Sequence, residues 1–348
     1  MTNTTLHLAQ TVQSLLNNNV YTKLMEFLSI SWMSISVLGI IGNIINIKTF
    51  TSAKLEDGMS IAFLVLSFSD LGFLVIMFGV GTSSIFYVIE VQSEYHRWFQ
   101  VEPYGTTLIL TNTGIMFYVL TELTTTYVSL ARCMCVTRPL HFKNTFTRRT
   151  TLVCTLTFAT FGLATSIPVV VNMGFKEGFD IRVNTSRTTL WLSPNREAIK
   201  RGVWGLTDIF LPFTTQIIVL ICLIVMANKL RNSLKFRQAF KTSDAENKLS
   251  DTNTRDAKTQ QSSKVDRKDT NIIKQVMLLS AVYIVCNTPK IIINITALLV
   301  DDFTLGRRYQ NLYLILNSVR VLCETVNSSA SLPIYYTYNG KFRILRRK

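Results

Sequence analysis

Histidine is scarce in this chain. Only three histidines are present, at positions 7, 96 and 141, and they are too scattered to suggest a metal site. The sequence also lacks a glycine-rich phosphate loop and a Ser/His/Asp arrangement in a plausible site. These absences argue against an enzyme.

Charged residues are also few. They make up 16% of the 348 residues, whereas a soluble domain usually carries about 25%. The hydrophobic residues, 48% of the chain, form long blocks bounded by charge. Each block reaches the length of about 20 residues that a helix needs to cross a membrane, and is too long for a barrel strand. The blocks cover residues 26–49, 59–89, 104–130, 150–173, 203–228, 272–299 and 311–338.

These blocks predict an all-α membrane protein with a seven-transmembrane helix bundle. The fourth block is rich in threonine, so we expect it to be the weakest in hydropathy. We expect an extracellular N-terminus over 1–25, the bundle over 26–338 and a cytoplasmic tail over 339–348. Residues 239–270 have no apolar period, which predicts a disordered inner loop.

The net charge of +15 raises the question of a nucleic-acid partner. Basic residues gather in the segments 138–149, 229–237 and 341–348, and the first and last of these contain no acid. This distribution follows the positive-inside rule and predicts a multi-pass protein of the plasma membrane with its N-terminus outside. The outer loop 174–202 is also basic, so the bias is imperfect. We expect membrane lipid, and no nucleic acid, among the partners.

Two segments that we place outside contain glycosylation sequons, at Asn3 and Asn184. The six cysteines all lie in the expected spans or near their inner ends. A disulfide within the outer loops is therefore excluded.

Short motifs follow one another in order along the seven expected spans. They are Gly42-Asn43, Leu66-Ser67-Phe68-Ser69-Asp70, Ala131-Arg132-Cys133, Arg138-Pro139-Leu140, Leu211-Pro212-Phe213, Cys286-Asn287-Thr288-Pro289 and Leu332-Pro333-Ile334-Tyr335-Tyr336. Together they resemble the landmarks of rhodopsin-like (class A) G-protein-coupled receptors over nearly the whole chain. The departures at Ala131, Cys133, Asn287 and Leu332 resemble a diverged invertebrate chemosensory or neuropeptide-receptor-like branch.

The resemblance implies a receptor that binds an extracellular ligand, activates a heterotrimeric G protein and carries a short amphipathic eighth helix. Arg132 would contact the G protein, and Ala131 replaces the acid that usually restrains it. We therefore expect elevated basal signalling, with Asp269 as a candidate replacement partner. Prolines inside spans five, six and seven would kink them. The residues expected to serve coupling and activation are Arg132, Pro139, Pro212, Pro289, Pro333 and Tyr336.

Asp70 is an acid at mid-membrane depth, which is costly unless the group is paired, protonated or hydrated. The resemblance implies that it binds a sodium ion through hard oxygen ligands. The polar core around it would include Asn43, Thr121, Ser328 and Ser329. A neutral aspartic acid that only packs helices is the alternative. Glu122 has no evident partner in the sequence, and no other metal or cofactor is expected.

We predict the residues of the ligand cavity from the positions that bind ligands in the family and from charged residues at membrane depth. Gly114 stands where amine receptors carry an aspartate, and Val326 stands where opsins carry the retinal lysine, so neither class fits. Lys290 would meet an anionic ligand or pair with Asp208 or Glu324. The ligand that we expect is a peptide or an acidic small molecule. The expected cavity residues are Gly114, Tyr118, Trp204, Asp208, Asn287, Lys290 and Asn294.

A transporter or channel is the alternative to a receptor. It would show substrate flux without a G protein. We find no filter-like segment and no repeat between the two halves of the chain, so this is the weaker interpretation.

Overall fold

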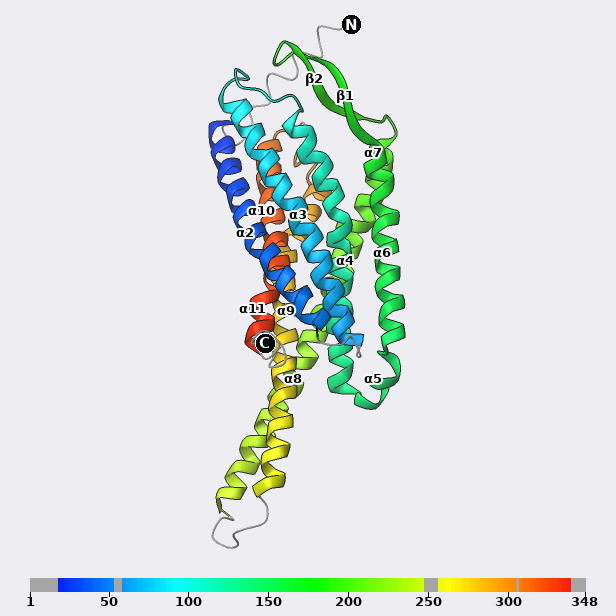
Figure 1. Ribbon diagram of the computed structural model, residues 1–348, viewed down its shortest axis with the longest axis vertical. Coiled ribbons are helices and arrows are strands. Elements are labelled where there is room, and N and C mark those ends of the chain that lie inside the picture. Colours follow the sequence, from blue (N-terminus) through cyan, green and yellow to red (C-terminus); the bar gives the residue numbers. More distant parts are fainter. Residues whose placement is uncertain (1–17, 53–57, 247–255, 305–306, 339–348) are drawn as a thin grey trace.

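The computed structural model describes residues 18–52, 58–246, 256–304 and 307–338, and for 233–246 and 256–272 it describes the backbone alone. Seven long helical segments in this part of the chain lie side by side (Figure 1). They are α2 (Asn18–Ser52), α3 (Gly58–Gln92), α4 (Pro103–Thr137), α6 (Arg148–Val171), the run α7 (Arg196–Trp204), η1 (Gly205–Phe210) and α8 (Leu211–Glu246), then α9 (Asp256–Leu299), and α10 (Gln310–Ser329) with α11 (Ser331–Tyr338). The predicted seven-helix bundle is confirmed.

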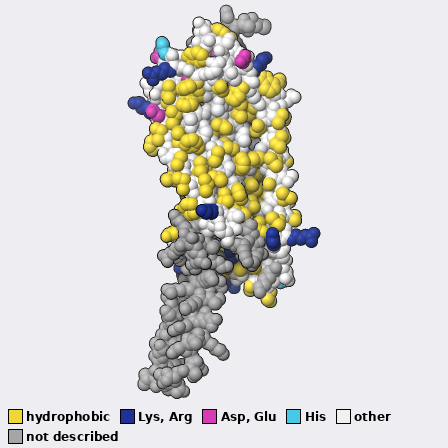
Figure 2. Space-filling view, viewed as in Figure 1, with side chains coloured by type: hydrophobic (Ala, Val, Ile, Leu, Met, Phe, Trp, Pro, Cys, Tyr) yellow, Lys and Arg dark blue, Asp and Glu magenta, His cyan; other side chains and the backbone are white. Residues whose placement is uncertain are grey.

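The outer surface of the bundle is apolar at mid-height. Figure 2 shows hydrophobic side chains over the middle of one face and charged ones near its two ends. Leu38, Leu156 and Val285 are 70%, 71% and 71% exposed. Large exposed aliphatic surface of this kind belongs against lipid rather than water.

Hydropathy does not rank the spans as we expected. The fourth span, α6, is long and apolar enough to cross a membrane, with a mean hydropathy of 1.7. Among the described helices, α4 and α10 are the spans that fall short of that standard instead. Both lie against several other helices, where their threonines, amides and ionisable groups contact protein rather than lipid. The prediction that the fourth span is the weakest was wrong, because the apolar residues of α6 outweigh its threonines, whereas α4 and α10 contain no comparably apolar window.

The segment 174–202, which we expected to be an outer loop, contains regular secondary structure. It contains an antiparallel hairpin of β1 (Met173–Asp180) and β2 (Thr185–Leu192), in which Met173 pairs with Leu192 and Asp180 pairs with Thr185. The hairpin lies at one end of the bundle, and the short helix α5 (Pro139–Thr145) lies at the other (Figure 1). Asn184, in the hairpin turn, has a φ of 51°, a conformation that asparagine tolerates well.

The inner connection between spans five and six differs from our expectation. α8 continues to Glu246 and α9 begins at Asp256, so helix covers most of the segment 239–270 that we expected to be disordered. The stretch contains five lysines, three alanines, two arginines and two glutamines, which favour helix without making it an apolar segment. Figure 1 shows the two helices extending together beyond the bundle. The expected eighth helix, the tail and Asn3 lie outside the described residues.

The prolines of the membrane spans occupy different positions in their helices. Pro289 lies inside α9. The seventh span is divided at Ala330, and Pro333 follows in the first turn of α11. Pro212 is the second residue of α8 and follows the π-helical turn η1. Pro168, inside α6, is a fourth membrane proline that the motif comparison did not single out.

Two clusters of buried residues stabilise the bundle. One lies toward the inner end and includes Phe63, Tyr127 and Tyr335. The other lies toward the hairpin end and includes Trp32, Phe73 and Tyr118. Buried polar and charged side chains, among them Asp70, Glu122 and Lys290, also lie inside the bundle.

Candidate functional site

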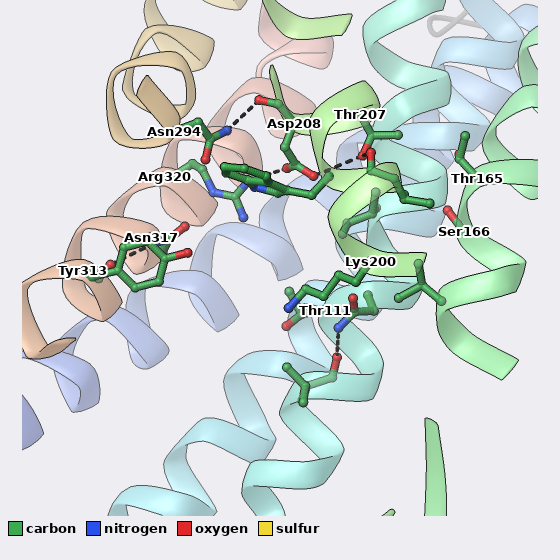
Figure 3. A pocket seen from close by; sticks show the side chains of 16 residues that line it. Thr111, Thr165, Ser166, Lys200, Thr207, Asp208, Asn294, Tyr313, Asn317 and Arg320 are labelled. Carbon is green, nitrogen blue, oxygen red and sulfur yellow. Dashed lines mark hydrogen bonds and ion pairs between the residues drawn. The ribbon is translucent and has the colours of Figure 1, made fainter. Parts of the chain in front are cut away.

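A cavity of about 150 Å³ lies among α4, α6, the α7–η1 run, α9 and α10, near the hairpin end of the bundle (Figure 3). Its lining combines apolar side chains with polar and charged ones. The side chains that carry most of its chemistry are Thr111, Asn112, Lys200, Asp208, Asn317 and Arg320. They come from α4, the α7–η1 run and α10, three segments that are far apart in the sequence, so the cavity exists only in the folded bundle.

Three of the seven residues predicted for the cavity line it: Trp204, Asp208 and Asn294. Pro212 explains how two of them meet. Because proline has no N–H, it leaves the carbonyl oxygen four residues earlier, that of Asp208, without its helical partner. The Asn294 side-chain amide donates to this carbonyl over 2.6 Å. A proline in span five is thus compensated by an amide from span six.

Lys200 is one of the lining residues that the sequence did not predict. It is half-buried on α7, and no hydrogen bond or ion pair joins its ammonium to any described residue. Figure 3 shows Lys200 among the cavity side chains without such a contact. Its sequence neighbours are polar, so the local pattern predicts only an outer loop. The remaining basic residue of the lining, Arg320, is already paired.

Ion pairs continue from the cavity into the centre of the bundle. The Arg320 guanidinium lies 3.2 Å from Asp208 and 3.4 Å from Glu324. The Lys290 ammonium lies 3.2 Å from Glu122 and 3.9 Å from Asp208. The expectation that Glu122 has no partner was wrong, because span six brings Lys290 directly to it. The expected pairing of Lys290 with Asp208 is present at the longer distance.

The other predicted cavity residues lie below the cavity rather than in its wall. Tyr118 donates its hydroxyl to Asn287 over 2.9 Å, and the Lys290 ammonium lies 5.1 Å from the centre of the Tyr118 ring. Gly114 faces α3, where an added Cβ would lie 2.7 Å from Met77. Gly114 therefore allows close packing of α3 and α4, and Tyr118, Asn287 and Lys290 form a polar layer beneath the cavity.

The polar core around Asp70 has the composition expected for a hard cation. Asp70 is 2% exposed and accepts a 2.9 Å hydrogen bond from Thr121. The amide of Asn43 donates to the Ser328 carbonyl over 3.0 Å, and the buried Ser328 hydroxyl has no hydrogen-bond partner within the described structure. Ser329 instead donates to backbone carbonyls, including that of Ile35. Carboxylate, hydroxyl and carbonyl oxygens of this kind fit a sodium ion.

Arg132, which is predicted to contact the G protein, lies at the inner end of the bundle. Arg132 is partly buried near the end of α4, and its neighbour Ala131 is fully buried. One turn away, the hydroxyls of Ser129 and Ser280 lie 2.9 Å apart and join α4 to α9. No sequence motif pointed to this pair. The Asp269 side chain lies outside the described residues.

Two further residues predicted for coupling lie at the inner end. Pro139 is exposed at the first position of α5, a position that suits proline. Tyr336 is 48% exposed, whereas its neighbour Tyr335 is fully buried against Phe50 and Phe63. Tyr335 is thus part of the core, and Tyr336 lies at the surface where a partner could reach it.

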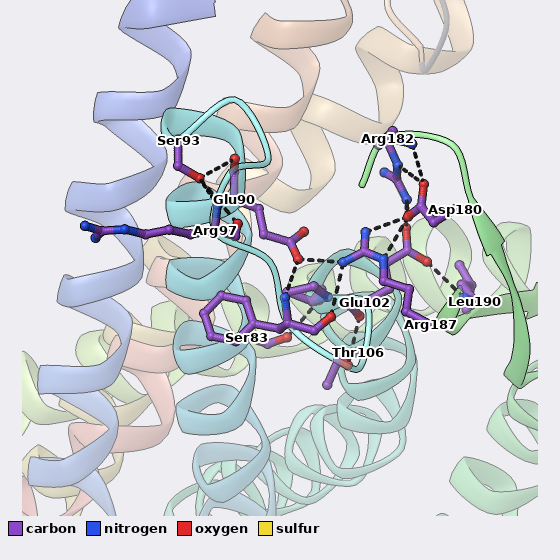
Figure 4. A network of polar contacts seen from close by, with 12 residues as sticks. Ser83, Glu90, Ser93, Arg97, Glu102, Thr106, Asp180, Arg182, Arg187 and Leu190 are labelled. Atoms are coloured by element: carbon purple, nitrogen blue, oxygen red, sulfur yellow. Dashed lines mark hydrogen bonds and ion pairs between the residues drawn. The ribbon is translucent and has the colours of Figure 1, made fainter. Parts of the chain in front are cut away.

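A buried charge network holds the hairpin onto the bundle (Figure 4). The Arg187 side chain is 0% exposed and contacts Glu90 of α3 at 2.6 Å and Asp180 at 2.7 Å. Arg182 contacts Asp180 at 2.9 Å and also pairs with Glu102 beside α4. Hydrogen bonds from Arg182 and Arg187 hold the pKa of the Asp180 carboxyl well below its usual range.

Covalent links take no part in this attachment. All six cysteines are free thiols, and none of them lies in the outer loops. The backbone adds to the charge network, because the N–H of Glu102 donates to the Thr188 carbonyl over 2.9 Å. The ion pairs therefore do for this hairpin what a disulfide could do in an oxidising compartment.

The apolar exterior and the seven-helix bundle, with a cavity beneath a hairpin, are those of a multi-pass membrane protein of the seven-helix class. Residues 33–295 match the family described as serpentine type 7TM GPCR chemoreceptor Srx. The match covers most of the chain, so the chain belongs to this family of G-protein-coupled receptors, which are not enzymes. No curated protein matches it.

Proposed function

We propose that this chain is a plasma-membrane chemoreceptor, with its N-terminus outside, that binds a small acidic molecule and activates a heterotrimeric G protein. The single observation that carries the ligand class is Lys200. Asp208 and Arg320 pair with each other, and Lys200 is the charged lining residue that makes no direct ion pair with a described residue, although Asp208 and Glu197 act on its charge from a distance. A cation in a site of low dielectric favours an anion that can pair with it.

The size of the cavity favours a small molecule over a peptide. Pockets for drug-sized ligands are about 300–1,000 Å³, and this cavity has about 150 Å³. The unpartnered Nε of Arg320 and hydroxyl of Ser166 are further donors near the cavity. A compact carboxylate would satisfy donors of this kind better than an amide or an amine.

Coupling would use the inner end. Arg132, the α5 loop with Pro139 and the inner ends of α8 and α9 would form the G-protein surface, as in the rhodopsin-like receptors that the motifs resemble. Pro289 and Pro333 would act as hinges, and a sodium ion at Asp70 would stabilise the resting state. Glycans at Asn184, exposed in the hairpin turn, and at Asn3 fit the same orientation.

The ligand class is tested by a G-protein reporter in cells that express the chain, challenged with small carboxylic acids and their primary amides. We expect responses to acids and not to the matching amides. Replacing Lys200 by Gln should raise the half-maximal concentration at least tenfold, because a hydrogen bond to a charged group contributes about 1.5–3 kcal/mol.

The matched control is Lys176→Gln, which removes an exposed lysine of β1 that does not line the cavity. It should leave the response unchanged. Equal potency of acids and amides, or a response to peptides alone, would contradict the proposed ligand class.

A further inference from the structure

A second hollow lies between α9 and α10 and opens on the apolar exterior of the bundle. It has a volume of about 480 Å³. Thr296 and Tyr309 carry the only hydroxyls in its lining, and Thr296 donates to the Ile292 carbonyl of its own helix over 2.8 Å. Ile292 is 58% exposed within it. This groove therefore offers a lipid-facing apolar surface.

The length of the groove matches one leaflet of a bilayer. Along α9 it runs from Pro289 to Val300, which is about 16 Å at about 1.5 Å per residue. Half of the hydrocarbon core of a bilayer is about 15 Å. A single extended acyl chain thus fits the groove from the membrane centre to the interface on the hairpin side.

The rim of the groove carries charges of both signs. Arg307, Arg308, Asp301 and Asp302 are all exposed at its interfacial end. The Arg308 guanidinium lies 5.6 Å from the centre of the ring of Tyr309, which lines the groove. Two cationic and two anionic side chains complement a headgroup that contains both a phosphate and an amine.

We propose that this groove binds a phospholipid of the leaflet on the hairpin side, with an acyl chain between α9 and α10 and the phosphate against Arg308. The end of the acyl chain reaches Pro289, which is next to Lys290 of the central ion pairs. The bound lipid therefore contacts the proline of the sixth span. A sterol, which has no phosphate, leaves the charges of the rim without a partner.

The test uses the purified full chain in nanodiscs that contain a phospholipid with a photoreactive group on its acyl chain. Labelled peptides are mapped by mass spectrometry. We expect labelling to concentrate on α9 and α10 around Ile292 and Leu316. Ile292→Trp, which fills the groove, should reduce this labelling at least fivefold.

Ile167→Trp is the matched control, because Ile167 is 51% exposed on α6, away from the groove. It should leave the labelling unchanged. If Ile292→Trp does not fold, Leu316→Trp fills the groove from the opposite helix. Labelling spread evenly around the bundle, or unchanged by the filling variant, would overturn the proposal.

The headgroup is tested by competition. Unlabelled phospholipid should displace the probe at least tenfold better than diacylglycerol with the same acyl chains. That preference should disappear in Arg308→Gln and persist in Arg97→Gln, which removes another exposed arginine near the same interface. Equal competition by diacylglycerol, or preferential labelling by a photoreactive sterol, would show that no phospholipid site exists here.

Discussion

The ammonium of Lys290 on α9 lies 3.2 Å from the carboxylate of Glu122 on α4, and their side chains are 4% and 0% exposed. The pair joins spans three and six directly below the cavity. The second oxygen of Glu122 has no hydrogen-bond partner within the described structure. Such a pair is expensive to bury and more expensive to break.

Removing one partner of this pair should destabilise the receptor strongly. We expect Lys290→Met to lower the free energy of unfolding by about 3–5 kcal/mol, because it leaves the Glu122 charge buried without its counter-ion. The double variant Glu122→Gln with Lys290→Met should recover most of that loss. Thermal unfolding in detergent measures both, and additive losses in the double variant would show that the two groups do not interact.

The hairpin should depend on charge and not on disulfides. Arg187→Met removes the buried guanidinium that contacts Glu90 and Asp180. Hydrogen exchange of the hairpin amides should rise at least about tenfold, since a broken buried pair costs more than about 1.4 kcal/mol. Arg201→Met, at an exposed arginine of α7, is the control and should leave exchange unchanged. Addition of a thiol reductant should also have no effect.

The pH dependence of the hairpin follows from Asp180. Its pKa is lowered in the folded state, so its pairs contribute stability that is fully present above the unfolded pKa of about 3.9. That stability is lost as the pH falls through the lower folded value. Exchange, corrected for intrinsic rates, should not change between pH 7 and about pH 5, and should rise only below about pH 4. Loosening already at pH 6 would contradict this account.

The hydroxyl pair of Ser129 and Ser280 bears on basal signalling. Ala131 cannot restrain Arg132, and this pair joins α4 to α9 one turn away. If the sixth span moves on activation, Ser280→Ala should raise ligand-independent signalling roughly two- to tenfold, which corresponds to one net hydrogen bond.

Ser67→Ala is the control for this effect, because the buried Ser67 hydroxyl donates to the Phe63 carbonyl of its own helix. Its basal signal should equal that of the wild type. A basal signal in Ser280→Ala no higher than in the control would show that the pair does not hold the resting state.

The bundle was predictable because membrane spans are visible in a sequence as long apolar blocks. The lower hydropathy of α4 and α10 can be read from the sequence, but the sequence does not show which helices their polar side chains contact. The extension of α8 and α9 beyond the bundle was missed for a related reason. Polar helix formers look like a linker when only hydropathy is considered.

The lining of the candidate site was predictable only in part, from the depth of residues in the expected spans. Trp204, Asp208 and Asn294 were found from span positions, and all three line the cavity. Lys200 and the partner of Glu122 were missed because they depend on contacts between residues that lie far apart in the sequence. A sequence pattern along one helix cannot reveal which side chain of another helix faces it.

The most direct test of the central claim is G-protein activation by this chain in cells, with Arg132→Ala compared with wild type at matched surface expression. The account predicts a wild-type signal, basal or evoked by small acids, that falls to background in Arg132→Ala. A wild-type signal that survives unchanged in Arg132→Ala, or substrate flux with no G-protein response, would contradict the receptor mechanism.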